Sequence, residues 1–293
     1  MLPLLLKKGL GYFQKFDREK ALKRGEQIGS LLYLLGYRKK VILKNLDIAF
    51  PEFSKEKKLQ ICKDVLKYFG RNIVDFARIP IYAKNEEFLK IAEIVEGKEV
   101  LDKYKNRGAI LITGHIGNWE IVGAVLESLG YKTSVLAYRQ KNRKVNQLIE
   151  DIRKSANIEV IYHDQPLKKM LTVLRKGQFL GFLADQNALR HRGVFVDFFG
   201  LPASTISFPA KLSLKYRVPV IFTYNYLDLD TKVYKIFFKE IDIDNYGKDD
   251  YKSLTQEFTK ELENAIRKNP SQYLWTHKRW KTRPEGEPEN IYD

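Results

Sequence analysis

The chain of 293 residues contains one cysteine, four histidines and no long apolar run, and each scarcity excludes a class of protein. A single cysteine excludes an internal disulfide framework and a cysteine-based zinc site. The few histidines form no HExxH motif or other closely spaced ligand set, so we expect no metal. A membrane-spanning helix needs roughly 20 consecutive apolar residues, and the longest apolar stretches here are far shorter.

Basic charge and core-forming residues are abundant instead. The chain has 52 Lys and Arg against 36 Asp and Glu, a formal net charge of +16, and 44% of its residues are hydrophobic. This hydrophobic content is ample for a buried core and excludes a disordered chain. The positive charge predicts an anionic partner, and by itself it leaves open nucleic acid, an anionic membrane surface and an acidic carrier protein.

The basic charge is concentrated near the start of the chain. Residues 1–58 hold 14 Lys or Arg and 6 Asp or Glu, which is half of the net charge in a fifth of the length. Apolar and basic residues alternate there at near-helical spacing, as in a helix that lies in a membrane interface or in an amphipathic helix packed on a core. We expect residues 1–85 to form a helical, membrane-facing segment whose last helix ends before Pro80. The apolar side chains expected to insert include Leu4, Leu5, Phe13 and Phe16.

The remaining residues, 86–293, alternate short apolar strands with helices. This regular alternation of strands and helices predicts an α/β fold with a mainly parallel sheet flanked by helices. No internal repeat or long linker separates this part from residues 1–85, so we treat the chain as one domain. The expected strands are 109–113, 134–138, 159–162, 179–184, 218–224 and 233–239, and the expected helices are 119–129, 143–155, 167–175, 207–216 and 254–267.

Ligands gather where the strands of a parallel sheet end, and one predicted strand end reads ILITGHIGNWE. His115 and Glu120 are five residues apart, which in a continuous helix would turn them about 140° away from each other. They can meet only if His115 lies in the turn before the helix, which Gly114 and Gly117 permit. Glu120 would then hold the imidazole in one tautomer, and backbone N–H groups near Gly117 would stabilise an oxyanion. A histidine that only caps the helix fits the same spacing equally well.

Several ordered motifs resemble one family. KNLDIAFPEFS, GHIGNWE, AYRQKN, LADQN, GVFVDFFGLPAST and SQYLWTHKRWKTRPEG are similar, in this order, to motifs of the lipid A biosynthesis acyltransferases, the lauroyl and myristoyl transferases of Gram-negative bacteria. The resemblance extends from about Val41 to Pro288. It places the chain among the membrane acyltransferases with a His-x4-acid motif. It implies a glycerol-3-phosphate acyltransferase-like core over residues 86–293.

By this resemblance, His115 is the general base on an acceptor hydroxyl and Glu120 is its partner, without a covalent acyl-enzyme. The implied reaction moves a fatty acyl group from acyl carrier protein, or from acyl-CoA, to a hydroxyl of a lipid A precursor, and it needs no cofactor. The sequence has no G-x-S-x-G elbow, in agreement with direct transfer. The expected location is the cytoplasmic face of the bacterial inner membrane, with peripheral or monotopic binding, because the apolar leader is shorter than the usual anchor of the family.

The second and third motifs imply a substrate-binding site. Arg139 matches the second motif and would clamp a phosphate bidentately, unless it is a solvated loop residue. Asp185 and Gln186 match the third motif, and Asp185 would orient an arginine because an unpaired buried carboxylate is costly. Arg190 and Arg192 follow in the same loop and are further candidates for substrate binding.

Two aromatic segments leave alternatives open. Phe195, Phe198 and Phe199 occupy a predicted loop of high apolar content, and they would line an acyl-chain groove or pack in the core. The segment from Arg267 to Arg283 holds six Lys or Arg, no acid and two tryptophans, a mixture suited to lipid headgroups and also to single-stranded nucleic acid.

Two other functions remain as alternatives. An acyltransferase for another glycolipid, such as a phosphatidylinositol mannoside, fits the same motifs because they do not specify the acceptor. A basic nucleic-acid-binding protein is the remote alternative. The sequence carries no motif for groove or strand recognition, so we expect no nucleic-acid partner.

Overall fold

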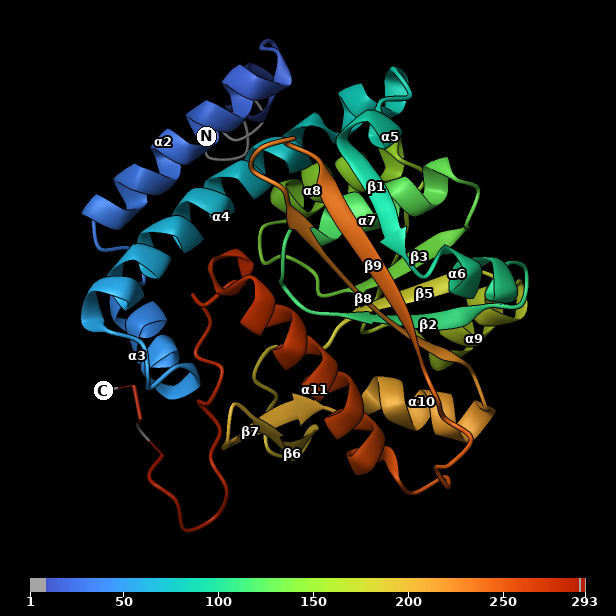
Figure 1. The fold of residues 1–293 in the computed structure, drawn as a ribbon. Coiled ribbons are helices and arrows are strands. Elements are labelled where there is room, and N and C mark those ends of the chain that lie inside the picture. Colours follow the sequence, from blue (N-terminus) through green and yellow to red (C-terminus); the bar gives the residue numbers. More distant parts are fainter. Residues whose placement is uncertain (1–8, 290, 293) are drawn as a thin grey trace.

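The structure is a computed structural model that describes residues 9–289, 291 and 292, and its centre is a seven-stranded sheet covered by helices (Figure 1). The helices are α2 (Arg18–Leu34), α3 (Lys39–Ala49), α4 (Lys55–Lys84), α5 (Phe88–Ile91), α6 (Lys98–Tyr104), α7 (Trp119–Ser128), α8 (Arg143–Ser155), α9 (Leu167–Arg175), α10 (Phe208–Tyr216), α11 (Tyr251–Lys268) and the 3-10 helix η1 (Pro270–Gln272). The strands are β1 (Ala92–Glu96), β2 (Ala109–Thr113), β3 (Thr133–Ala137), β4 (Glu159–Tyr162), β5 (Phe179–Leu183), β6 (Gly193–Phe198), β7 (Leu201–Ile206), β8 (Val220–Leu227) and β9 (Tyr234–Ile241).

The strand order of the large sheet is β1-β9-β8-β2-β5-β3-β4. Five neighbouring strands, β8, β2, β5, β3 and β4, run parallel, while β9 pairs antiparallel with β8 and parallel with β1. The predicted α/β fold with a mainly parallel sheet is confirmed. The sequence pattern did not predict β1, and the expected loop over residues 193–206 is in fact the antiparallel hairpin β6–β7.

Alternate residues of the central strand β2 point to opposite faces of the sheet, and each face is covered by its own core. Ala109 and Leu111 belong to the core beneath α7. Ile110 and Ile112 belong to the core that includes residues of α9, α10 and α11. Because both faces are buried, the strand reads as a continuous apolar run that ends at the loop carrying His115.

The N-terminal part is largely helical, as predicted, and α2 lies beside the long helix α4 (Figure 1). Glycines allow this close approach: a Cβ added at Gly29 would lie 2.2 Å from the carbonyl oxygen of Leu66. The helix α4 does not end before Pro80 but continues to Lys84, which corrects that prediction. A proline removes one helical N–H donor, and the burial of neighbouring side chains such as Ile79 compensates for the loss.

The exposed apolar side chains of the N-terminal part differ from the expected ones. Phe13 is buried against α4 with Val74 and Ala77 and cannot insert into lipid in this conformation, while Leu4 and Leu5 lie outside the described residues. An exposed leucine group, Leu31, Leu34 and Leu35, occupies the C-terminal end of α2 instead, with exposed fractions of 55%, 79% and 73%. Among the described residues, no helix combines the length and the apolar content that crossing a membrane requires.

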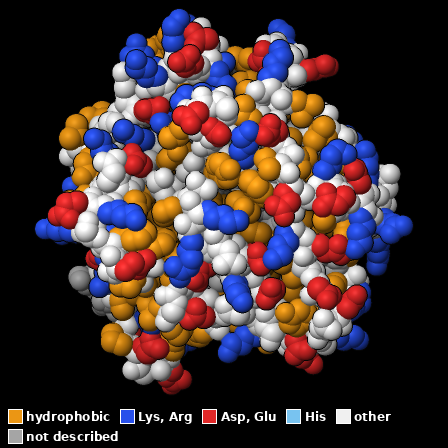
Figure 2. Space-filling view, viewed as in Figure 1, with side chains coloured by type: hydrophobic (Ala, Val, Ile, Leu, Met, Phe, Trp, Pro, Cys, Tyr) orange, Lys and Arg blue, Asp and Glu red, His pale blue; other side chains and the backbone are white. Residues whose placement is uncertain are grey.

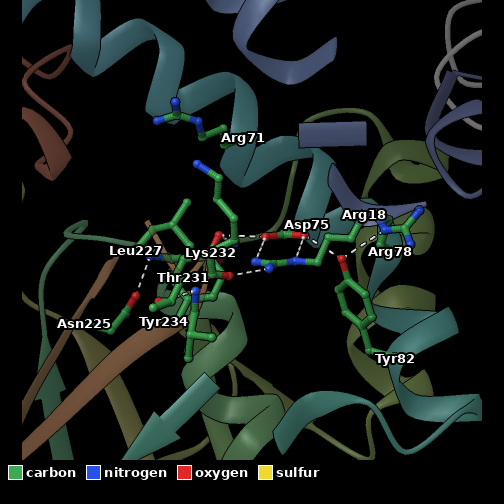
Figure 3. A network of polar contacts seen from close by, with 12 residues as sticks. Arg18, Arg71, Asp75, Arg78, Tyr82, Asn225, Leu227, Thr231, Lys232 and Tyr234 are labelled. Carbon is green, nitrogen blue, oxygen red and sulfur yellow. Dashed lines mark hydrogen bonds and ion pairs between the residues drawn. The ribbon is translucent and has the colours of Figure 1, made fainter. Parts of the chain in front are cut away.

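A buried carboxylate on α4 connects the N-terminal part to the sheet (Figure 3). Asp75 is fully buried and forms a two-point ion pair with Arg18 of α2, while the Tyr82 and Tyr234 hydroxyls donate to its two oxygens at 2.5 and 2.8 Å. These four donor contacts satisfy a charge that would otherwise be costly to bury. Tyr234 of β9 also accepts from the Asn118 side chain at 3.4 Å, so the network reaches the turn before α7.

Candidate active site

The turn between β2 and α7 holds His115 at the carboxyl end of the central strand. Gly117 has φ +60° in this turn, and a Cβ there would lie 2.1 Å from the carbonyl oxygen of Asn225, so glycine is required. The side chain of Asn72 on α4 donates to the Gly117 carbonyl at 2.6 Å. His115 therefore lies before the helix, as the sequence predicted, in a turn that packs against Asn225 and accepts a hydrogen bond from Asn72.

His115 is held by Asp185, which follows the neighbouring strand β5. The imidazole Nδ1 and Asp185 Oδ1 are 2.7 Å apart, and the His115 backbone N–H donates to Asp185 Oδ2 at 2.9 Å. A carboxylate on Nδ1 favours the tautomer in which Nδ1 carries the proton and Nε2 is free to accept one. The Nε2 atom lies 3.4 Å from the side-chain nitrogen of Gln186, which is exposed beside it.

Asp185 is charged despite its burial. Its side chain is 2% exposed, and burial alone would raise its pKa. The charge of His115, the two hydrogen bonds from that residue and the charge of Arg279 outweigh burial and lower the pKa of Asp185 to about 2. Asp185 thus orients a histidine rather than the arginine expected from the sequence.

Glu120, predicted to contact His115, pairs with another residue in the structure. Both of its carboxylate oxygens accept from Arg153 of α8, at 2.9 and 2.6 Å, and both side chains are about one-sixth exposed. The contact expected between Glu120 and His115 is therefore replaced by the contact between Asp185 and His115. The reason is the first turn of α7, which carries Glu120 toward α8, whereas β5 delivers Asp185 beside β2.

The backbone N–H of Gly117, which was expected to stabilise an oxyanion, already has a hydrogen-bond acceptor. Its N–H donates to the Gln272 carbonyl at 2.9 Å, since the segment after α11 pairs with the turn. The N–H of Asn118 donates to the Asn225 side chain at 2.8 Å. In this conformation neither group is available to an oxyanion.

An apolar pocket lies between α7 and the sheet and begins beside the histidine. Trp119 is in its wall, and the Trp119 ring packs edge-on against the His115 ring at 4.6 Å between centroids. The ion pair of Glu120 and Arg153 also lines the pocket. Its apolar lining includes Leu111, Leu126, Val135, Ile158 and Leu183, and the two glycines of the lining are Gly123 and Gly181.

The remaining candidates for substrate binding lie on exposed loops. Arg139 is half exposed, pairs with Asp164 at 3.0 Å and stacks over the Tyr162 ring. Arg190 and Arg192 are exposed in the loop that follows Asp185.

The aromatic candidates and the C-terminal basic cluster are largely internal. Phe198 and Phe199 are buried against Trp280 and Trp275, in the core that was their alternative, whereas Phe195 is partly exposed. Arg279 and Arg283 are also buried, and they donate to carbonyl oxygens of the β6–β7 hairpin. These two arginines therefore fix the hairpin and do not form part of a headgroup-binding surface.

Four residues of the site were not predicted from the sequence: Asn72, Arg153, Asn225 and Gln272. Each acts through a partner distant in sequence, such as Gly117 for Asn72 and Glu120 for Arg153. One signal was present, because Thr223 and Asn225 are polar residues on the buried face of an otherwise apolar strand.

Comparison with known proteins agrees with the family resemblance of the sequence motifs. Residues 9–282 match the family model described as bacterial lipid A biosynthesis acyltransferase. The lipid A biosynthesis palmitoleoyltransferase of Escherichia coli K12 is 24% identical over 268 residues, which cover 90% of this chain and 85% of that protein. The lauroyltransferase of the same pathway and organism is 22% identical, covering 86% of this chain and 81% of the relative, and the myristoyltransferase is 22% identical, covering 83% and 75%.

Proposed function

The chain belongs to the bacterial lipid A biosynthesis acyltransferase family, and we propose that it transfers a fatty acyl group from acyl carrier protein thioester to a hydroxyl of a lipid A precursor. Family membership confirms the resemblance found in the motifs and makes the chain an acyltransferase. The observation that supports the chemistry is the pair of His115 and Asp185, with the His115 ring packed against Trp119 in the wall of an apolar pocket. Acyl-CoA is the alternative donor, and no cofactor takes part in the proposed reaction.

The proposed mechanism is direct transfer with His115 as general base. The Nε2 atom takes the proton from the acceptor hydroxyl, while Asp185 holds Nδ1 and stabilises the imidazolium that forms. The hydroxyl oxygen attacks the thioester carbon, the C–S bond breaks, and the thiolate takes the proton back from the imidazolium. The resemblance gives Glu120 the role of partner. The contacts favour Asp185 in that role, with Glu120 and Arg153 in the pocket wall.

The lining of the pocket beneath α7 is chemically suited to an acyl chain. Its lining surface is mainly apolar, and it includes Trp119, which touches the imidazole. An alkyl chain bound there would remove its own surface and that of the lining from water, at roughly 25 cal/mol per Å² of apolar area. The thioester carbon would then lie near His115 at the mouth of the pocket, and Phe195, the partly exposed aromatic candidate, is left outside this lining.

We propose that the enzyme acts at the cytoplasmic face of the inner membrane and binds peripherally. The exposed leucine group of α2 is followed by Arg38, Lys39 and Lys40, and apolar side chains beside basic ones suit an anionic lipid surface. On the face shown in Figure 2, Lys and Arg are interspersed with acidic and apolar side chains rather than gathered in a stripe. Among the residues that the structure describes, this face therefore shows no basic stripe of the kind expected in a nucleic-acid-binding protein.

A reconstituted reaction tests the proposal. The purified protein is incubated with acyl carrier protein thioester or acyl-CoA and a lipid A precursor with free hydroxyls, and the product is identified by mass spectrometry. We expect one added acyl group with the wild type and none with His115→Ala, after a thermal melt has shown that the variant is folded. Wild-type turnover by His115→Ala would refute the mechanism. Transfer to a phosphatidylinositol mannoside but not to the lipid A precursor would favour the other glycolipid.

A further inference from the structure

Three backbone N–H groups of the catalytic turn already have hydrogen-bond acceptors. The N–H groups of His115, Gly117 and Asn118 donate to Asp185, Gln272 and Asn225, respectively. A carbonyl oxygen that becomes negatively charged during acyl transfer needs hydrogen-bond donors that are already in place. These three N–H groups are therefore unavailable to that oxygen in this conformation.

The strand β8 carries two buried donors without partners. Ile221, Thr223, Asn225 and Leu227 share the face of β8 that points to α7, and Ile221 and Leu227 belong to the core there. Thr223 and Asn225 are each 1% exposed. Within residues 9–289, 291 and 292, the Thr223 hydroxyl and the Asn225 side-chain nitrogen have no hydrogen-bond partner. A buried polar group without a partner destabilises a fold, so two such groups on one strand require an explanation.

One of these groups lines the apolar pocket, and the other lies against the catalytic turn. Thr223 is in the pocket wall together with Trp119. Asn225 lies against Gly117, since a Cβ at Gly117 would be 2.4 Å from Asn225 Oδ1. The Asn225 Oδ1 atom accepts from Asn118, which fixes the amide and leaves its nitrogen as the free end. Neighbouring pairs of β2 and β8, such as Ile112 and Phe222, place Thr223 level with the end of β2 that leads to His115.

We propose that Thr223 and Asn225 bind the carbonyl oxygen of the acyl thioester and stabilise the negative charge that develops on it. The inference rests on the proposed acyl transfer. An unsubstituted acyl chain in the pocket carries a single oxygen, that of the thioester carbonyl, so it is the one acceptor the chain can offer to these donors. When the acceptor hydroxyl forms its bond to the carbonyl carbon, the C=O electron pair moves to this oxygen. It returns as the C–S bond breaks, and His115 passes the proton to the departing thiolate.

The test uses the opposite effects of one substitution on stability and on activity. Thr223→Val keeps the shape of the side chain and removes the unpaired hydroxyl, so we expect an equal or higher Tm. The same variant should lose about 100-fold in kcat, as expected for one oxyanion donor, with a smaller change in KM. Thr223→Ser should recover most of the loss. Asn225→Asp keeps the acceptor for the Asn118 N–H and removes the donor, and we expect a comparable fall in kcat.

The matched control is Thr255→Val. Thr255 is also fully buried, but its hydroxyl donates to the Tyr251 carbonyl at 2.6 Å, and the residue is not part of the pocket lining. We expect Thr255→Val to lower the Tm and to leave kcat unchanged. A lower Tm for Thr223→Val would mean that the hydroxyl has a structural partner, and it would overturn the inference.

Two unreactive analogues of the acyl donor distinguish binding of the carbonyl group from binding of the acyl chain. In the ketone analogue of the acyl carrier thioester a CH2 group replaces sulfur, and in the thioether analogue a CH2 group replaces the carbonyl. Thr223→Val should bind the ketone at least tenfold more weakly than the wild type and the thioether equally well. Equal affinity of both proteins for both analogues, or wild-type kcat in Thr223→Val, would refute the inference. A wild-type protein that transfers no acyl group from any donor would refute the proposed function itself.

Discussion

Asp185 holds His115 at two points, through Nδ1 of the ring at 2.7 Å and through the backbone N–H at 2.9 Å. The two residues are 70 positions apart in the chain, and the pairing of β2 with β5 brings them together at one edge of the sheet. The two contacts fix both the tautomer and the place of the histidine. Asp185 thus makes the contact with His115 that the sequence predicted for Glu120.

The first prediction compares the two carboxylates. Asp185→Asn should lower kcat by about 10²–10⁴-fold, because an amide no longer favours the tautomer with a free Nε2 and no longer stabilises the imidazolium. Glu120→Gln should lower kcat less, since its carboxylate pairs with Arg153. Steady-state kinetics on variants with unchanged circular dichroism decide between the two. The reverse order would restore Glu120 as the partner of His115, as the resemblance implies.

The sequence predicted six of the seven strands of the large sheet and the turn that carries His115, because hydrophobic periodicity and glycine positions are local signals. It did not predict the partner of the histidine, because the pairing of β5 with β2 joins strands that are distant in the sequence and leaves no local pattern. The basic cluster after α11 shows the same limit. The sequence indicated that Arg279 and Arg283 lie on the surface. They are buried, because carbonyl oxygens of a hairpin distant in the sequence accept their hydrogen bonds.

The second prediction concerns the length of the acyl chain. Gly181 lies in the pocket lining, and a Cβ there would meet Val135 Cγ1 at 3.4 Å, an ordinary contact. Gly181→Ala should therefore fold and reduce the room in the pocket, so that the preferred donor becomes shorter by one or two carbons. Competition between donors of different length, read by mass spectrometry, measures the preference. Gly247→Ala, outside the pocket lining, is the control, and an unchanged preference in Gly181→Ala would place the acyl chain elsewhere.

The third prediction concerns acid stability and His277. Burial lowers the pKa of this residue to about 4, and its Nε2 accepts the Asn187 backbone N–H at 3.0 Å, which only the neutral ring can do. Between pH 6.5 and 4 the unfolded chain binds a proton that the folded chain does not, so the free energy of unfolding should decrease as the pH falls through this window. Above pH 6.5 His277 should contribute no pH dependence.

Urea denaturation at several pH values measures this effect. His277→Gln keeps an acceptor and does not titrate, so its stability should vary less between pH 6.5 and 4 than that of the wild type. His163→Gln, which changes an exposed histidine, is the matched control and should keep the wild-type slope. Equal slopes for wild type and His277→Gln would show that His277 is not the group responsible.

The fourth prediction assigns membrane binding to the exposed leucine group. Leu34 and Leu35 are 79% and 73% exposed, so changing both to Ser should leave the Tm within about 1 °C of the wild type. Burying one leucine side chain contributes about 1.5–3 kcal/mol, so loss of two should weaken binding to vesicles with anionic lipid by at least tenfold. Salt should weaken wild-type binding only partly, since salt does not screen the apolar contacts of the leucines.

The control replaces Leu89 and Leu229, which are 58% and 43% exposed elsewhere on the surface. If both double variants sediment with vesicles as the wild type does, the C-terminal end of α2 does not contact the membrane.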